Sequence, residues 1–173
     1  MNRNRKIVFL SLLTAGALIL SVIEGMIPFP FVAPGAKLGL PNMVTLSVIV
    51  IFGFKSGMTV AMLRSLLYLL IAGNVASFLY SFSGAIFSTL VMAFVYKFFK
   101  NYFSLVGVSI FGALAHNTAQ VFVAALVVEN LRVLTYLPIL YIVSLFTGCF
   151  VGYTAIYIVK NLKKQFQILK WSA

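Results

Sequence analysis

Apolar residues fill six long stretches of the chain, and short segments rich in glycine, proline and charged residues separate them. A helix that crosses the hydrocarbon core of a bilayer needs about 20 mostly apolar residues. The pattern therefore predicts an all-α membrane protein with six transmembrane helices, in a single domain over residues 1–173. The predicted spans are residues 7–27, 41–54, 57–72, 78–99, 105–128 and 136–159.

Composition agrees with this pattern. Of the 173 residues, 62% are hydrophobic and only 9% are charged, whereas a soluble domain carries about 25% charged residues. The second and third spans are short and contain glycine or proline, so we expect them to tilt, to extend into the preceding loop or to be covered by it. The first span follows the basic residues 2–6 and resembles a signal peptide. Because five spans follow it and no cleavage site is convincing, a retained signal-anchor helix is favoured.

Basic residues give the chain a net charge of +11, and their positions predict its orientation. Six spans place both termini on one side of the membrane, and ten of the thirteen basic residues fall on that side. The positive-inside rule makes this side the cytoplasm, and the same distribution argues against a nucleic-acid-binding patch. The ten residues are Arg3, Arg5, Lys6, Lys55, Lys97, Lys100, Lys160, Lys163, Lys164 and Lys170. On the outer side we expect Lys37, Glu24, Glu129 and Arg132.

The segment after the last span, residues 160–173, is a basic and weakly amphipathic tail. We expect it to lie along the anionic inner leaflet, and docking onto a cytoplasmic partner is the alternative. Cys149 is the single cysteine, so the chain forms no intrachain disulfide. Its surroundings in the sequence are apolar, which is typical of a small buried residue.

Two small-residue motifs predict close approach of helices. Gly148 and Gly152 form a GxxxG match in the sixth span, and Ser11 and Ala15 form a small-xxx-small match in the first. Either motif could pack within the bundle or against another subunit.

Residues 28–42 form the predicted outer loop. Four prolines and two glycines forbid a continuous helix, yet the segment is too apolar for a free loop. We expect it to pack into the outer mouth of the bundle, with Pro41 opening the second helix and Asn42 pointing inward. Two interpretations remain open: a structural plug with an incidental Lys37, or a lid over a binding site with Lys37 facing an anionic group.

Arg64 lies in the middle of the third span, where a guanidinium costs about 2.5–3.5 kcal/mol on insertion scales. The chain has no aspartate, and Glu24 and Glu129 lie at the ends of their spans, so we expect no membrane carboxylate to neutralise it. Arg64 then binds an anionic ligand, since arginine recognises carboxylate and phosphate in a bidentate way, or it bonds helix-end carbonyls in a structural role. Tyr68, one turn later, shares its face.

A second polar island lies in the middle of the fifth span. Helical spacing places His116, Asn117 and Gln120 on one polar strip, and equal depth with Arg64 predicts one midplane cavity. His116 is either a proton relay or part of a structural interhelical hydrogen bond. One histidine with no nearby cysteine or aspartate cannot fill a metal coordination shell, so we expect no metal.

Catalytic motifs are missing from the sequence. There is no P-loop, so the chain does not itself hydrolyse ATP, and there is no HExxH or GxSxG motif. Paired carboxylates for acid–base catalysis are also missing. We therefore expect a protein that is not an enzyme and holds no cofactor.

Three features together, residues 34–42, Arg64 and residues 112–120, carry a resemblance to a known family. The chain resembles the bacterial Gx transporter family, also named heptaprenyl diphosphate synthase component I, over nearly its whole length. That family is similar to the substrate-binding S components of energy-coupling factor (ECF) transporters. The resemblance implies a six-helix S-component-like bundle with cytoplasmic termini and an outward-opening ligand site capped by the first loop. The candidate ligand-binding residues are Lys37, Asn42, Arg64, Tyr68, His116, Asn117 and Gln120.

The resemblance also implies partners: a transmembrane coupling protein and two cytoplasmic ATPases in a bacterial plasma membrane. Small-residue motifs on the first helix mediate such coupling, and Ser11 and Ala15 are the match here, although they depart from the usual Ala-x-x-x-Ala pattern.

Three functions therefore compete. The first is a membrane substrate-binding or transport component for a small, anionic organic ligand. The second, from the synthase name, is a non-catalytic membrane subunit that supports heptaprenyl diphosphate or menaquinone synthesis. The third is a component of a membrane flavin- and quinone-based electron-transfer assembly. An isoprenoid, a quinone or a flavin would suit these functions, and nothing in the sequence selects among them.

Overall fold

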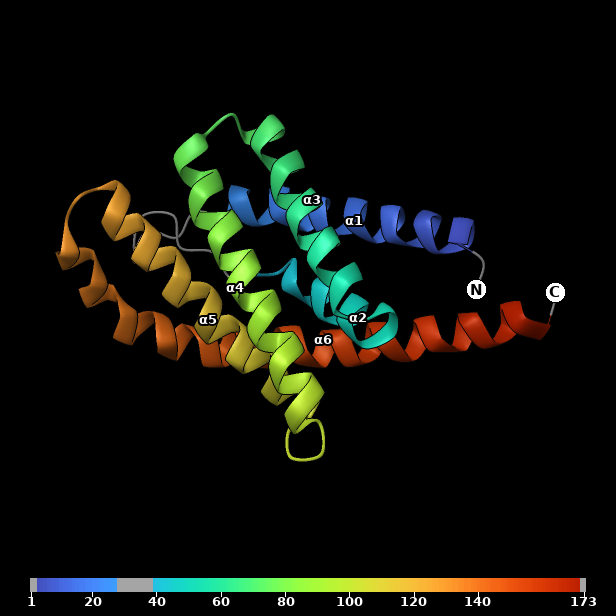
Figure 1. The fold of residues 1–173 in the computed structure, drawn as a ribbon. Coiled ribbons are helices and arrows are strands. Elements are labelled where there is room, and N and C mark those ends of the chain that lie inside the picture. The colour runs from blue at the N-terminus through green and yellow to red at the C-terminus, as the bar shows by residue number, and fades with distance from the viewer. Residues whose placement is uncertain (1–2, 28–38, 172–173) are drawn as a thin grey trace.

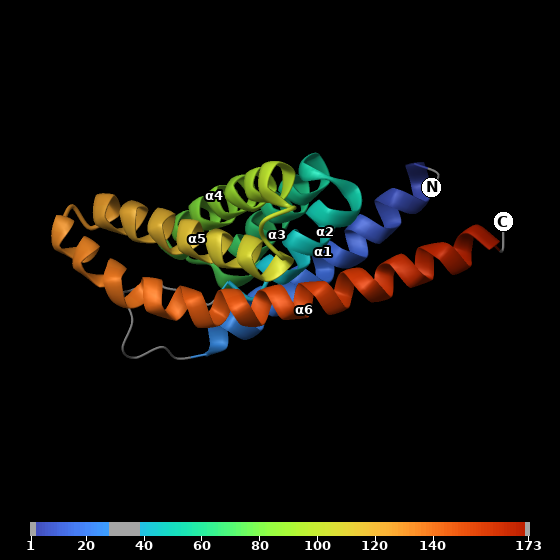
Figure 2. The same cartoon turned by 90° about the horizontal axis from the view of Figure 1, so that it is seen from below.

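The protein folds as a bundle of six α-helices in the computed structural model, which describes residues 3–27 and 39–171, with side chains to residue 166. Both ends of the chain lie at the same end of the bundle (Figures 1 and 2). The helices are α1 (Arg3–Met26), α2 (Asn42–Phe52), α3 (Phe54–Ala72), α4 (Val75–Phe99), α5 (Leu105–Val127) and α6 (Leu137–Trp171), and a 3₁₀ helix, η1 (Leu131–Tyr136), precedes α6.

Helix α2 is the centre of the bundle. It packs against α1, α3, α4, α5 and α6, while the outer helices pack in the order α1–α3–α4–α5–α6 around it. Every residue from Asn42 to Ile49 is buried. Because α2 contacts protein on all sides, it is apolar all round rather than along one stripe.

Five of the described helices are long and apolar enough to cross a membrane, and α2 is an additional shorter apolar helix. The prediction of six helices is confirmed, and this is a multi-pass membrane protein. Its second span, however, covers only 11 residues, about 16 Å at 1.5 Å per residue. Helix α2 is therefore too short to cross the hydrocarbon core by itself.

Helix α6 is longer than the predicted sixth span. That span was expected to end at Val159, and α6 continues without a break through the basic tail to Trp171. Phe166 in this extension packs against two other helices, with ring centroids 4.9 Å from Phe9 of α1 and 5.7 Å from Phe52 of α2. The first part of the tail therefore belongs to the bundle.

The GxxxG motif of α6 packs inside the bundle. A Cβ atom added at Gly148 would lie 2.7 Å from the Cα atom of Ile110, and one at Gly152 would lie 3.2 Å from the carbonyl oxygen of Leu105. Both distances are shorter than ordinary carbon contacts, so only glycine allows α6 to approach the backbone of α5 this closely. Of the two packing modes left open by the sequence, this motif uses the internal one.

Helices α1 and α5 begin, and helices α2, α4 and α6 end, at the same end of the bundle. We call this the basic end. Arg3, Arg5, Lys55, Lys97 and Lys100 lie there. The polar residues of the candidate site lie deeper in the bundle and toward the opposite end.

Candidate functional site

Arg64 is buried between α3 and α1, with 2% of its surface exposed. Its Nη1 donates a hydrogen bond of 2.9 Å to the hydroxyl of Ser21. Within the described part of the chain, its Nε and Nη2 have no hydrogen-bond partner. These two nitrogens lie on one edge of the planar guanidinium, so together they form a single fork that faces no protein acceptor.

Glu24 is buried beside this arginine, at 4% exposure. Glu24 lies near the end of α1 opposite its basic start, as expected, but its side chain is turned into the bundle. The expectation that no carboxylate reaches Arg64 is wrong, because the two charges attract each other. The carboxylate also accepts hydrogen bonds from the backbone N–H groups of Gly39 and of Leu40, the latter at 3.3 Å.

These backbone hydrogen bonds explain why a carboxylate lies inside the bundle. Gly39 and Leu40 precede α2 and are not helical, so their N–H groups have no partner in a helix. A non-helical backbone at membrane depth is stable only where protein or water satisfies such groups. Glu24 satisfies both, and it fixes the position at which the chain enters α2.

His116 lies on the other side of this entry point. The Nδ2 atom of Asn42, the first residue of α2, lies 3.4 Å from the Nδ1 atom of His116, and both side chains are buried. His116 is the twelfth of the 23 residues of α5, so the start of α2 reaches mid-helix depth. The expectation that Asn42 points inward is confirmed. Pro41 was expected to be the first residue of the helix, and it is instead the residue that caps it, directly before Asn42.

Gly84 of α4 leaves room for this cluster. A Cβ atom at Gly84 would lie 2.8 Å from Cε1 of His116 and 2.9 Å from Cγ of Gln120. Gln120 is 2% exposed, and neither its Nε2 nor its Oε1 has a hydrogen-bond partner among the described residues. Because a buried amide without partners costs about 1–3 kcal/mol, a ligand that pairs with it gains a corresponding advantage.

Asn117 points elsewhere. Its Nδ2 donates to the hydroxyl of Ser144 on α6 at 2.7 Å, and that hydroxyl donates to the carbonyl of Leu140, also at 2.7 Å. The predicted single strip of His116, Asn117 and Gln120 is thus divided between two helix interfaces. Asn117 joins α5 to α6, whereas His116 and Gln120 lie toward α2 and α4.

Arg64 and His116 do not meet directly. Their helices, α3 and α5, are not neighbours in the described structure, and α2 and α4 lie between them. The link between them is the short segment Gly39–Asn42, which contacts Glu24 at one end and His116 at the other. Tyr68 extends from α3 toward α1, where its hydroxyl lies against Gly25. Lys37 lies outside the described residues.

The small-residue motif of α1 faces outward. Ser11 and Ala15 are exposed and line a groove of about 400 Å³ between α1 and α3, whose other lining residues include Thr59, Leu63 and Leu67. A Cβ atom at the adjacent Gly16 would meet nothing within 4 Å. Unlike the motif of α6, this one is not used within the described bundle.

A family model decides the relationship of the chain to known proteins. The model of heptaprenyl diphosphate synthase component I matches residues 13–158. This range includes Arg64 with Glu24 and His116 with Gln120. The chain belongs to this family. No curated protein matches this family member in sequence.

The solved structure of the S component of a bacterial ECF transporter is similar to this component I protein. The TM-score is 0.73 at 20% sequence identity, and the match covers 95% of this chain and 99% of the other. At this identity the likeness establishes a shared fold, and the S-component-like bundle implied by the sequence is confirmed.

Three residues of the candidate site in this component I protein were missed by the sequence interpretation. Ser21 and Glu24 were missed as partners of Arg64, although their spacing of three places them on one face of α1. Gly84 was missed because nothing local distinguishes it from other helix glycines. Its role depends on which α5 side chains lie opposite.

Proposed function

We propose that this protein is the substrate-binding membrane subunit of an ECF-type transporter, and that it binds a small organic anion beside Arg64. The fold shared with a transporter S component supports the transport role. The residues around Gly39–Asn42 support the position of the site, because this segment lies between Arg64 with Glu24 and His116 with Gln120.

The observation that carries the proposal is the free edge of the Arg64 guanidinium. A buried arginine normally has its donors satisfied, because an unmet donor costs free energy. Here the Nε–Nη2 edge has no protein acceptor in the described structure. A carboxylate or a phosphate presents two oxygens at the spacing of that edge, so an anionic ligand group is the best match.

Other groups of the site add selectivity to this charge recognition. Glu24 reduces the net positive charge near Arg64, which favours a ligand with one or two negative charges over a highly charged one. Gln120 offers both a donor and an acceptor, and His116 and Asn42 add further polar atoms. An isoprenoid, quinone or flavin with an anionic group would satisfy this set. The loop before Gly39, with Lys37, is proposed as the cap of the site.

The exposed face of α1 is proposed as the coupling surface. Ser11 and Ala15 line an apolar groove that a helix of another protein could enter, because small residues allow helix backbones to approach closely. The proposed partners are a transmembrane coupling protein and cytoplasmic ATPases, which would supply the ATP hydrolysis that this chain lacks. The proposed location is a bacterial plasma membrane.

The test compares Arg64→Gln with Arg132→Gln, an exposed arginine of η1 that serves as the matched control. Each protein is purified in mild detergent, denatured, and its released small molecules are identified by mass spectrometry. We expect an organic anion with the wild type and with Arg132→Gln, and none with a folded Arg64→Gln variant. An unchanged set of released molecules in Arg64→Gln would contradict the proposal.

The family name favours a second candidate function. Heptaprenyl diphosphate synthase component I suggests a non-catalytic subunit that supports prenyl diphosphate or menaquinone synthesis. Deletion of the gene should then lower the menaquinone content of the cells, and a prenyl synthase should co-purify with this protein. Normal menaquinone in the deletion, together with co-purified ATPases, would leave only the transport function.

A further inference from the structure

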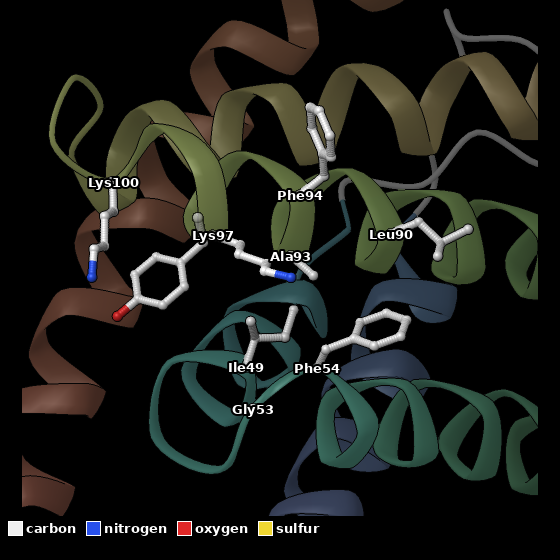
Figure 3. A pocket seen from close by; sticks show the side chains of 9 residues that line it. Ile49, Gly53, Phe54, Leu90, Ala93, Phe94, Lys97 and Lys100 are labelled. Carbon is white, nitrogen blue, oxygen red and sulfur yellow. The ribbon is translucent and has the colours of Figure 1, made fainter.

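A cavity of about 520 Å³ lies at the basic end, far from the candidate ligand site. It is formed where the last turns of α4 pass the turn between α2 and α3 (Figure 3). Phe54, Leu90 and Phe94 provide apolar walls, and Lys97 and Lys100 are the charged residues of the lining. The residues assigned to transport or ligand binding are not among those that line it.

No acidic side chain lies near the two lysines in the described part of the chain. The sequence contains only two acidic residues, Glu24 and Glu129. Glu24 lies near the end of α1 and Glu129 just after α5, so both are at the opposite end of the bundle. Lys97 lies over the ring of Phe98, 5.1 Å from its centroid, and this contact leaves its charge unneutralised.

Lys97 and Lys100 both line this cavity. In Figure 3 the Lys97 amine lies beside Ala93 and Ile49, and Lys100 extends farther toward the end of α4. Two cations that line one cavity near a membrane surface favour an anionic occupant.

The apolar walls indicate what kind of anion this is. Phe54, Leu90 and Phe94 are exposed by 41%, 42% and 57%, although they lie in helices that cross the membrane. The described protein leaves these apolar side chains uncovered, so lipid chains can contact them. A molecule that fits the cavity combines an anionic head with apolar chains, which is the chemistry of a membrane lipid.

We propose that this cavity binds an anionic glycerophospholipid of the surrounding bilayer. Its phosphate lies between Lys97 and Lys100, and an acyl chain extends along Leu90 and Phe94 in the direction of α4. Basic pockets between transmembrane helices on the cytoplasmic side are sites where anionic headgroups bind. The proposal depends neither on Arg64 nor on the transport function.

Native mass spectrometry of the detergent-purified protein tests the proposal. The protein is titrated with phosphatidylglycerol or with phosphatidylcholine of the same acyl chains. We expect one phosphatidylglycerol to bind in preference to phosphatidylcholine. The double variant Lys97→Gln/Lys100→Gln should lose about thirty-fold in affinity for phosphatidylglycerol.

The matched control is Lys163→Gln/Lys164→Gln, which removes the same charge from exposed positions on α6. This control should bind phosphatidylglycerol as the wild type does. An equal loss in both double variants would indicate general charge attraction and would overturn the site. So would wild-type binding in Lys97→Gln/Lys100→Gln.

Further measurements keep the test decisive. If the lysine double variant does not fold, Leu90→Trp fills the cavity while retaining both lysines, and it should also release the lipid. Wild-type binding in Leu90→Trp would overturn the proposal. Displacement of the lipid by inorganic phosphate alone would assign the lysines to a free anion. Tighter binding of farnesyl diphosphate than of phosphatidylglycerol would assign the cavity to a prenyl diphosphate instead.

Discussion

Helix α5 carries two buried polar regions, one that faces α6 at Asn117 and one that faces α4 at Gln120. The two regions differ in which of their polar atoms have hydrogen-bond partners. Toward α6, Asn117 donates to Ser144, which donates in turn to Leu140, so the amide nitrogen of Asn117 is paired although its Oδ1 atom has no partner among the described residues. Toward α4, Gln120 has both amide atoms without a partner in the same part of the chain. Gly84 supplies no side chain that could pair with them.

The difference separates structural polar groups from candidate binding groups. A hydrogen-bonded pair between helices stabilises the bundle, and no other molecule is needed. A buried amide without a partner destabilises it until something binds. The α5–α6 region therefore holds the fold together, and the α4–α5 region is the one expected to respond to a ligand.

The largest effect should come from Gly84→Ala. The new methyl group would lie within 3 Å of His116 and Gln120, so we expect a loss of about 1–3 kcal/mol in unfolding free energy and release of the ligand. Denaturant titration of the detergent-solubilised protein measures the unfolding free energy, and mass spectrometry of released molecules measures the bound ligand. Gly16→Ala is the control, because its methyl group meets nothing, and it should stabilise α1 by about 0.5–1 kcal/mol.

Asn117→Ala should have the next largest effect on stability. It removes the 2.7 Å hydrogen bond that Asn117 donates to Ser144, and we expect a loss of about 0.6–1.7 kcal/mol in unfolding free energy, the range for such hydrogen bonds in membranes. The ligand should remain bound. A double-mutant cycle with Ser144→Ala measures the coupling, and additive effects of the two substitutions would show that the pair contributes nothing.

Gln120→Leu should separate stability from binding. It removes a buried amide that has no partner, so the unfolding free energy should stay constant or rise by up to about 1 kcal/mol. Affinity for the ligand should nevertheless fall by about ten-fold, which corresponds to the loss of one hydrogen bond. If Gln120→Leu instead lowers stability as Asn117→Ala does, the distinction between the two regions is wrong.

The smallest effect on the bundle should come from the double variant Ser11→Leu/Ala15→Leu. Both side chains are exposed at the groove between α1 and α3, so we expect no change in unfolding free energy or in ligand content. Co-purification of the coupling protein should be lost, because leucine prevents close helix approach. Retention of the partner at wild-type levels would remove α1 from the coupling surface.

The sequence predicted the number of helices and most of their boundaries because long apolar stretches are a strong signal. It could not predict that α6 continues past Val159, since the contacts of Phe166 with Phe9 and Phe52 that accompany the extension are tertiary. It also could not predict that Glu24, near the end of its helix, is buried beside Arg64, because an acidic residue at a helix end normally faces water.

The candidate site was predicted in composition but not in arrangement. Arg64, Asn42, His116 and Gln120 were all expected to be buried, and they are. Sequence spacing shows which side chains share a helix face but not which neighbouring helix that face meets. For this reason Asn117 was grouped with His116, although only the packing of α6 against α5 determines where it points.

The shortness of α2 bears on how the protein enters the membrane. A helix of 11 residues is about half as long as the hydrocarbon core is thick, so α2 is a poor substrate for insertion by the translocon on its own. Its buried Asn42, Thr45 and Ser47 add to this difficulty. We therefore expect α2 to integrate late, when α1 and the later helices already surround it. Nascent chains that carry Val48→Cys in α2 and are truncated before α4 should consequently react with water-soluble thiol labels.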